Sequence, residues 1–317
     1  MDSGLTGRLL AGDKLACARL ISVVENESPG YLDCLKAVYP HAGNAYVIGV
    51  TGPPGSGKST LTDKLVKRMA DDGQKIGIIA VDPTSPFSKG AILGDRIRMG
   101  GVSENKNVFI RSMGTRGCLG GLSKATANAL VILAAYGCAF IFIETVGVGQ
   151  SEIDIVKYAD TTLMVLAPGL GDDIQAIKAG VMEIGDVFAV NKADREGAER
   201  TCRETLAMLD FKSDWDFKPP VCLTVAETGE GVDALLEGIL AHKSHLFGTG
   251  KLAEKRAQKK AAHVRDILRD RLDRRMEELI TLHTGLNGEG KDPYSLSDII
   301  MKEKTWTFPE LTTSASQ

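Results

Sequence analysis

Residues 45–60 read AYVIGVTGPPGSGKST and join an apolar run of strand length to a glycine-rich loop. The loop, Gly52 to Ser59, matches the pattern G-x-x-x-x-G-K-[S/T] in the strand-to-helix setting that this pattern requires. Its glycines let backbone N–H groups approach phosphate oxygens, and the helix that follows adds the positive end of its dipole. The stretch therefore predicts a nucleoside triphosphate site at the end of the first strand of an α/β domain.

Six further apolar runs of strand length follow along the chain, and most of them precede a stretch of helix length. They lie at residues 75–81, 107–112, 138–144, 161–167, 186–190 and 220–224. Their apolarity is continuous rather than alternating, as in strands that are buried on both faces of a sheet. The pattern predicts a P-loop NTPase domain over residues 44–246, built as a doubly wound, mostly parallel sheet covered by helices.

Helical segments flank this predicted domain on both sides. Residues 1–43 carry apolar side chains at helical spacing and predict an N-terminal helical extension. Residues 247–317 predict a C-terminal helical arm and tail, in which apolar residues recur at i+4 steps: Val264, Leu268, Leu272, Met276 and Ile280. Such a stripe either packs back on its own domain or contacts a second copy or another partner, and we weigh these two alternatives evenly.

The phosphate loop supplies the first candidate ligands of the nucleotide, which are Gly52, Pro53, Pro54, Gly55, Ser56, Gly57, Lys58, Ser59 and Thr60. We expect Lys58 to reach the β- and γ-phosphate oxygens. The hydroxyl of Ser59 is expected to bind Mg²⁺, a hard ion that prefers oxygen ligands. Together with the base segment described below, these ligands predict GTP or GDP with Mg²⁺ as the cofactors.

Carboxylates at the ends of two core strands are the candidate metal ligands on the other side of the phosphates. The run CAFIFIE ends in Glu144, and a carboxylate buried there would be costly without a cation. Three residues later the amide of Gly147 is placed to contact the γ-phosphate and report its presence. Asp82 ends the second strand and Asp95 follows in a glycine-containing loop, although either could simply cap a helix.

The predicted base site is the segment Asn191-Lys192-Ala193-Asp194, which follows a strand at the carboxyl edge of the sheet. A carboxylate at Asp194 can accept from both N1–H and N2–H₂ of guanine, an arrangement that adenine does not offer, so the predicted nucleotide is GTP. Lys192 is expected to lie along the base, and Asn191 to tie this loop to the phosphate loop. Downstream, the backbone N–H near Val225 and Ala226 is expected to donate to guanine O6.

Composition excludes some classes of partner. Lys and Arg number 38 against 41 acidic residues, a net charge of −3, which provides no general field for nucleic acid or an anionic membrane. The six cysteines form no C-x-x-C pair. Residues 125–143 carry no charge but break at Gly137, which favours a buried helix and strand over a membrane span. We therefore expect a cytoplasmic protein.

On these motifs, over about residues 40–245, the sequence resembles the GTPases that accompany adenosylcobalamin-dependent methylmalonyl-CoA mutase, the MeaB and ArgK type. The likeness rests on GPPGSGKST, VDPTSPFSKGAILGDRIRM, ETVGVGQSE and PGLGDDIQAIKAGVMEIGD before NKAD. It implies a homodimeric chaperone that gates delivery of adenosylcobalamin to an acyl-CoA mutase and helps eject damaged cofactor. It also implies Mg²⁺ and switch positions at Ser59, Asp82, Asp95 and Glu144.

The resemblance implies a further switch over residues 169–178, and there the candidate residues are Asp172, Asp173, Gln175 and Lys178. One position departs from the family, which commonly has Ser where Val225 stands. Because the expected contact uses a backbone N–H group, we expect guanine binding to survive this change.

Hydrolysis is expected to be slow without a partner, because Val148 follows Gly147 where many small GTPases carry a glutamine. Gln150 is the candidate for orienting the attacking water. Arginines that could stabilise transition-state charge, each weighed against the commoner structural role, are Arg96, Arg98, Arg111 and Arg116. The catalytic candidates are thus Lys58, Glu144, Gly147 and Gln150.

Two alternatives share this architecture. A GTPase that inserts metal into nickel enzymes needs a cluster of thiolates or imidazoles. His242 and His245 lie one turn apart, but with no third ligand near they are expected to be a surface pair. A transport-linked kinase or ATPase is the other alternative, and the guanine-type segment ending in Asp194 argues against ATP.

Overall fold

The structure is a computed structural model that describes residues 3–43, 45–82, 102, 104–114, 124–145, 154–169, 184–287 and 292–302. The chain divides into two compact units, residues 1–259 and residues 260–317. The first unit contains the sheet and every described residue of the predicted nucleotide site, and it is described first.

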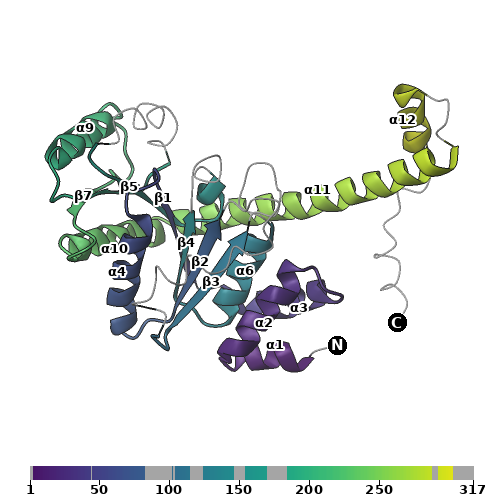
Figure 1. Cartoon of the computed structure of the whole chain (residues 1–317), viewed down its shortest axis with the longest axis horizontal. Coiled ribbons are helices and arrows are strands. Elements are labelled where there is room, and N and C mark those ends of the chain that lie inside the picture. Colours follow the sequence, from purple (N-terminus) through teal and green to yellow (C-terminus); the bar gives the residue numbers. More distant parts are fainter. Residues whose placement is uncertain are drawn as a thin grey trace. The chain divides into compact units, whose positions relative to one another are not determined.

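A seven-stranded sheet forms the centre of the first unit, with the strand order β3-β2-β4-β1-β5-β6-β7 and every pairing parallel (Figure 1). The strands are β1 Tyr46–Thr51, β2 Ile76–Asp82, β3 Val108–Gly114, β4 Phe140–Thr145, β5 Thr161–Leu166, β6 Val187–Asn191 and β7 Val221–Thr224. Each lies within two residues of the range that the sequence predicts. The predicted α/β class and the doubly wound parallel sheet are confirmed.

Helices cover both faces of this sheet. In the first unit they are α1 Ser3–Leu10, α2 Lys14–Glu25, α3 Tyr31–Val38, α4 Lys58–Asp71, α6 Lys124–Ala135, α9 Ala198–Asp210 and α10 Val232–Gly248, together with the start of α11 Lys251–Asn287. The uncharged run of residues 125–143 forms α6 and β4, as the sequence predicts. Within the described ranges, no helix is both long and apolar enough to cross a bilayer.

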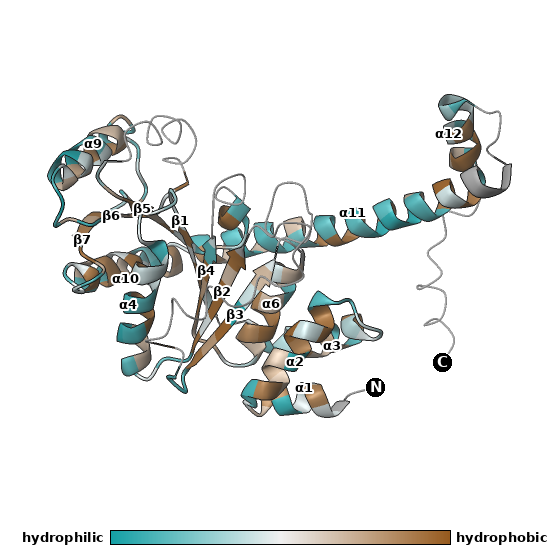
Figure 2. Cartoon of the chain, in the orientation of Figure 1, coloured by the Kyte–Doolittle hydropathy of each residue, from teal (hydrophilic) through white to brown (hydrophobic). Residues whose placement is uncertain are grey.

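Alternate side chains of each strand enter two different cores, which is why the strands are mostly brown in Figure 2. On one face, Tyr46, Ile48 and Val50 of β1 pack with apolar residues of α4 and α10. On the other face, Ile141 and Ile143 of β4 pack with α1, α2 and α6. A smaller cluster joins α9 to β5 and β6 on that second face. This covering of both faces explains why the strands read as continuous apolar runs.

The N-terminal helices are one layer of this core. Leu9, Leu20 and Ile21 are buried to within 1% exposure in the same cluster as strands β2 to β4 and helix α6. Each such side chain contributes about 1.5–3 kcal/mol on burial. In addition, the ammonium group of Lys14 donates to the backbone oxygen of Val108 on β3 at 2.7 Å. Residues 3–38 therefore support the edge of the sheet that β2 and β3 form.

The second unit is described by itself. It contains the rest of α11 and helix α12 Pro293–Lys302. Four of the five residues of the predicted stripe on α11 are exposed in the single chain, with relative exposures of 47% for Val264, 53% for Leu268, 46% for Leu272 and 42% for Met276. The fifth, Ile280, is half-buried.

Candidate functional site

The phosphate loop begins where β1 ends, at the centre of the sheet, and glycines are needed at its two tightest points. Gly52 has φ 137°, and a Cβ atom there would lie 2.1 Å from the backbone oxygen of Val165 on β5. Gly57 has φ 90°, and a Cβ atom there would lie 2.2 Å from Nδ2 of Asn191. Only glycine fits either place, so the loop is held between β5 and the predicted base segment.

The end of this loop presents donors of the kind that phosphate oxygens bind. Helix α4 starts at Lys58 after Gly57, and no side chain caps its first N–H groups. The ammonium group of Lys58 is only 7% exposed and donates to the backbone oxygens of Gly52 at 2.6 Å and Pro53 at 3.1 Å. The hydroxyl oxygen of Ser56 is buried and has no hydrogen-bond partner among the described residues. A buried cation, uncapped amides and an orphan hydroxyl fit a bound triphosphate.

Glu144 lies beside this loop because β4 pairs directly with β1, with Glu144 opposite Val50. It points to the same face of the sheet as Phe142, the face that α4 covers. The hydroxyl of Ser59 on α4 donates to Oε1 of Glu144, whose residue is 1% exposed. A hydroxyl and a carboxylate brought together in this way are the oxygen ligands that Mg²⁺ prefers, so these residues fit that ion. Asp82 ends β2, the strand on the other side of β4.

The predicted base segment follows β6, and Asn191 joins it to the phosphate loop as the sequence predicts. Its Nδ2 donates to the backbone oxygen of Ser56 at 2.8 Å, and the residue is 2% exposed. The next residue, Lys192, has φ 58° and donates from Nζ to the backbone oxygen of Gly55 at 2.6 Å. Two side chains, one from the last residue of β6 and one from the residue directly after it, thus set the position of the phosphate loop.

In the loop after β6, the carboxylate of Asp194 is accessible to a ligand. Asp194 is exposed, and it makes no hydrogen bond or ion pair with any residue that the structure describes. The backbone N–H of Ala226 donates to Oδ1 of Asn191 at 3.0 Å. Donation from Ala226 to guanine O6 therefore requires that this bond be shared or given up. Val225 holds its own loop through an N–H bond to the backbone oxygen of Glu230 at 2.9 Å.

Several sequence-predicted residues lie outside the described ranges. They are Asp95, Gly147, Gln150, Asp172, Asp173, Gln175 and Lys178, and with them Arg96, Arg98 and Arg116. Among the predicted arginines, Arg111 is described. It lies on β3, where Nη2 contacts Glu25 at 2.5 Å and the hydroxyl of Ser22 at 3.1 Å on α2. In the structure Arg111 therefore has a structural role, which is the alternative that was weighed against a role in stabilising transition-state charge.

The prediction that His242 and His245 form a surface pair is wrong for His242. His242 is 4% exposed, and its Nδ1 lies 2.8 Å from the hydroxyl oxygen of Thr161 at the start of β5. The face of α10 that packs on the sheet carries this residue inward. His245 lies one turn on and contacts Asp216 at 2.6 Å. No group of three or more metal-binding side chains occurs in the part of the chain that the structure describes.

Comparison with known proteins places these features in one family. The profile of the family described as methylmalonyl-CoA mutase-associated GTPase MeaB matches residues 17–280. A Pyrococcus horikoshii protein, provisionally named a GTPase, is 52% identical over 307 residues, which cover 94% of this chain and 97% of that protein. The Escherichia coli GTPase ArgK is 34% identical over 268 residues, which cover 81% of each chain.

Two further similarities agree with this assignment. A mouse protein named methylmalonic aciduria type A homolog, mitochondrial, is 35% identical over 214 residues, which cover 66% of this chain and 52% of that protein. A solved structure described as a LAO/AO transport system kinase matches with a TM-score of 0.72 at 24% identity, covering 94% of this chain and 96% of that chain. This last likeness bears on the fold alone.

The residues that the family profile spans include the whole phosphate loop, Glu144 and the segment from Asn191 to Asp194. The same residues meet around the carboxyl ends of β1, β4 and β6. From this agreement of geometry and sequence we conclude that the chain belongs to the MeaB family of methylmalonyl-CoA mutase-associated GTPases.

Proposed function

We propose that this GTPase is a chaperone of a cobalamin-dependent acyl-CoA mutase such as methylmalonyl-CoA mutase. In this function it gates delivery of adenosylcobalamin and protects or reactivates the mutase. The observation that carries the proposal is the match of a mutase-associated family over residues 17–280, which includes the phosphate loop, the base segment and residues 169–178. The name of the mouse relative, which refers to methylmalonic aciduria, points the same way.

In the proposed complex GTP lies with its phosphates in the loop Gly52–Thr60 and its base against Asp194. Lys58 gives up its bonds to the loop carbonyls and pairs with the phosphates, while Asn191 keeps the two loops in register. Ser59 and Glu144 hold Mg²⁺, with Asp82 and Asp95 as further direct or outer ligands. When bound, the ion offsets charge that develops on the phosphate oxygens. Gly147 senses the γ-phosphate, and Gln150 orients water.

Coupling to the mutase follows from linkage. If bound GTP favours one arrangement of residues 169–178, a mutase that binds this arrangement better must in return change the affinity for GTP. The chain has Val148 where many small GTPases have glutamine, so its own rate is expected to be slow. A client mutase is then expected to accelerate hydrolysis by ordering water and charge-stabilising groups.

Single-turnover hydrolysis of GTP, measured with and without a cobalamin-dependent mutase, tests this proposal. We expect acceleration by the mutase, and we expect Asp172→Ala, Gln175→Ala and Lys178→Ala to remove most of it while GTP affinity is retained. Asp214→Ala is the matched control, because Asp214 is exposed on the loop after α9. Failure of every cobalamin mutase to accelerate hydrolysis would contradict the chaperone function. Full acceleration of all three variants would remove residues 169–178 from the coupling.

A further inference from the structure

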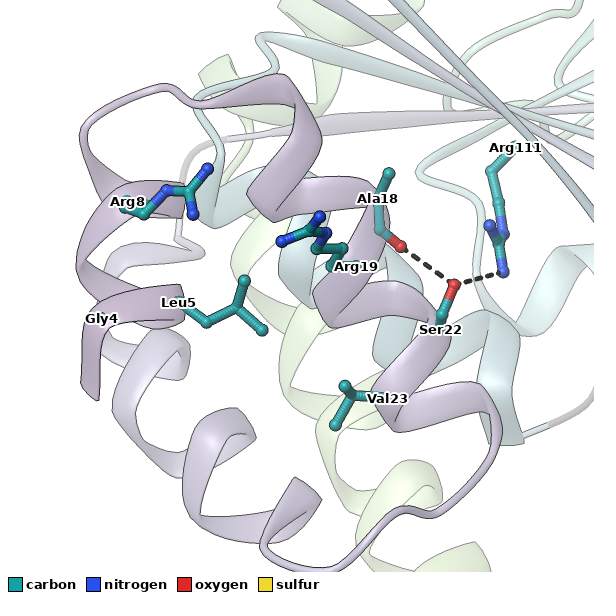
Figure 3. Close-up of a pocket in the computed structure, with 8 residues that line it drawn as sticks. All are labelled: Gly4, Leu5, Arg8, Ala18, Arg19, Ser22, Val23 and Arg111. Atoms are coloured by element: carbon teal, nitrogen blue, oxygen red, sulfur yellow. Dashed lines mark hydrogen bonds between the residues drawn. The ribbon is translucent and has the colours of Figure 1, made fainter. Parts of the chain in front are cut away.

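A cavity of about 530 Å³ lies between α1, α2 and β3, and no residue of the nucleotide site lines it (Figure 3). Its lining residues are Gly4, Leu5, Arg8, Ala18, Arg19, Ser22, Val23 and Arg111. Cavities of this volume commonly hold small organic ligands. Three of the eight residues that line it, Arg8, Arg19 and Arg111, are arginines.

Two of the three arginines are fixed by acidic partners at the edge of the cavity. Arg8 donates from Nε and Nη2 to Oδ2 of Asp13, at 2.8 Å and 2.5 Å. Arg111 contacts Glu25 at 2.5 Å and the Ser22 hydroxyl at 3.1 Å, and its side chain is 24% exposed. Both guanidinium groups are therefore held in place before any ligand arrives, which lowers the ordering cost of binding.

Arg19 differs from the other two. It lies between them in sequence and space, and it makes no ion pair or hydrogen bond with any residue that the structure describes (Figure 3). Three guanidinium groups against the carboxylates of Asp13 and Glu25 leave the cavity with one net positive charge. A single oxyanion is the ligand group that this charge and the planar donor fork of arginine fit.

The wall opposite the charges is apolar. Leu5 of α1 is 7% exposed, and Val23 of α2 lies across from it in the same cavity. A bare inorganic ion would make no apolar contact with these two side chains, whereas a short hydrocarbon chain would pack against them. The lining therefore favours an amphipathic ligand over a simple anion.

We propose that this cavity binds a small organic monocarboxylate, whose carboxylate lies against Arg19 between Arg8 and Arg111 and whose short apolar chain contacts Leu5 and Val23. The site is separate from the phosphate loop, and the proposal does not depend on the identity of any mutase.

Calorimetric titration of the full chain with hexanoate tests the proposal, with Mg²⁺ and GDP present in excess so that the nucleotide site is filled. We expect saturable binding of hexanoate, and binding of the uncharged hexanamide that is weaker by about tenfold or more, since a charge-assisted hydrogen bond is lost. Equal affinities for hexanoate and hexanamide would overturn the proposal. Inorganic phosphate that binds as tightly as hexanoate would contradict the role of the apolar wall.

Variants locate the binding. Arg19→Gln is expected to weaken hexanoate binding by about tenfold, and Arg19→Glu to abolish it. Because Arg19 is exposed on α2, both variants should fold, and unchanged GDP affinity checks this. Arg265→Gln, at an exposed arginine of α11, is the matched control and should bind hexanoate as the parent does. If Arg19→Gln and Arg265→Gln bind equally well, the ligand lies elsewhere and the assignment is wrong. Val23→Phe, which places a larger side chain where the apolar chain of the ligand is proposed to lie, provides a second variant that should weaken binding.

Discussion

At the scale of single residues, the side chain of Asn191 connects the phosphate loop to the predicted base-side loop. Its amide donates to Ser56 in the phosphate loop, and its oxygen accepts from Ala226 in the base-side loop. A residue with both a donor and an acceptor on one short side chain is needed for this, and aspartate would supply only acceptors. The chemistry of asparagine was enough to predict the tie to the phosphate loop from sequence.

Asp194→Asn is expected to change the base that the protein prefers. The carboxylate is expected to accept from two donors of guanine, whereas an amide would accept from only one of them and would offer a donor that suits xanthine. Loss of charge-assisted hydrogen bonds predicts GTP affinity lower by about a hundredfold, with xanthosine triphosphate bound better than GTP. Competition of both nucleotides against a fluorescent guanine nucleotide measures this. Asp214→Asn is the control, and an Asp194→Asn protein that still prefers GTP would remove Asp194 from the base site.

Other residue contacts could not be predicted in this way. Arg111 pairs with Glu25 and Ser22, which lie 86 and 89 residues earlier in the chain. No local pattern in the sequence links positions that are so far apart, and a single arginine does not indicate which acidic residue it will pair with. The same holds for His242, whose partner Thr161 lies 81 residues away. Local patterns predict which side chains face a core, whereas the partner of a buried polar group depends on the packing of distant elements.

At the scale of elements, the starts of β1 and β5 carry a buried polar layer opposite the nucleotide edge. The hydroxyl of Tyr46 lies 2.6 Å from that of Thr161, which in turn contacts His242 of α10. Asp160 is 2% exposed and accepts from Lys259 of α11 at 2.6 Å and from the N–H of Val47 at 2.9 Å. This layer fixes α10 and the first turns of α11 on the sheet.

His242 gives this layer a dependence on pH. Burial lowers its pKa below the ordinary value of 6.5, against the opposing effect of Asp186. Lys255, His245, Asp160 and the ring of Phe217 also face it. The unfolded chain therefore binds more protons below about pH 6.5, so the free energy of unfolding falls as pH decreases through this window.

His242→Gln is expected to remove that contribution. Urea unfolding between pH 8 and pH 5.5 should show a smaller loss of stability in the variant than in the parent. His41→Gln is the matched control, because His41 is exposed on the short helix Tyr39–His41 that follows α3. The same slope of stability against pH in the parent and in His242→Gln would contradict the prediction.

At the scale of the whole molecule, the exposed stripe on α11 leads us to expect a homodimer. Val264, Leu268, Leu272 and Met276 are each between 42% and 53% exposed in the single chain. A row of four large apolar side chains at i+4 steps is costly in water and is the pattern that paired helices cover. From the sequence alone, pairing with a second copy and packing on the chain's own domain were equally weighted, because an apolar stripe predicts that it is buried but not what buries it.

Leu268→Glu with Leu272→Glu is expected to convert the dimer to a monomer, measured as a halving of mass by light scattering. GTP affinity should be unchanged, because both residues belong to the second unit, whereas every described residue of the nucleotide site belongs to the first. The control is Arg265→Glu with Arg269→Glu. These two arginines are exposed and directly follow Val264 and Leu268 in the sequence, but they are not part of the apolar stripe. A parent protein that is monomeric at micromolar concentration, or a double variant that remains dimeric, would count against the stripe.

The strand order has a consequence for how the protein is made. The phosphate loop is synthesised early, but β1 is held on its two sides by β4 and β5, and the loop itself is tied by Asn191. At 5–20 residues per second, the ribosome needs roughly 7 to 26 seconds to proceed from Ser59 to Asn191. During that interval the nascent chain has the complete phosphate-loop sequence but not yet all of the residues that hold the loop in the folded domain. We therefore expect nucleotide capture to begin only after translation has passed Asn191, so that GTP stabilises finished domains rather than growing ones.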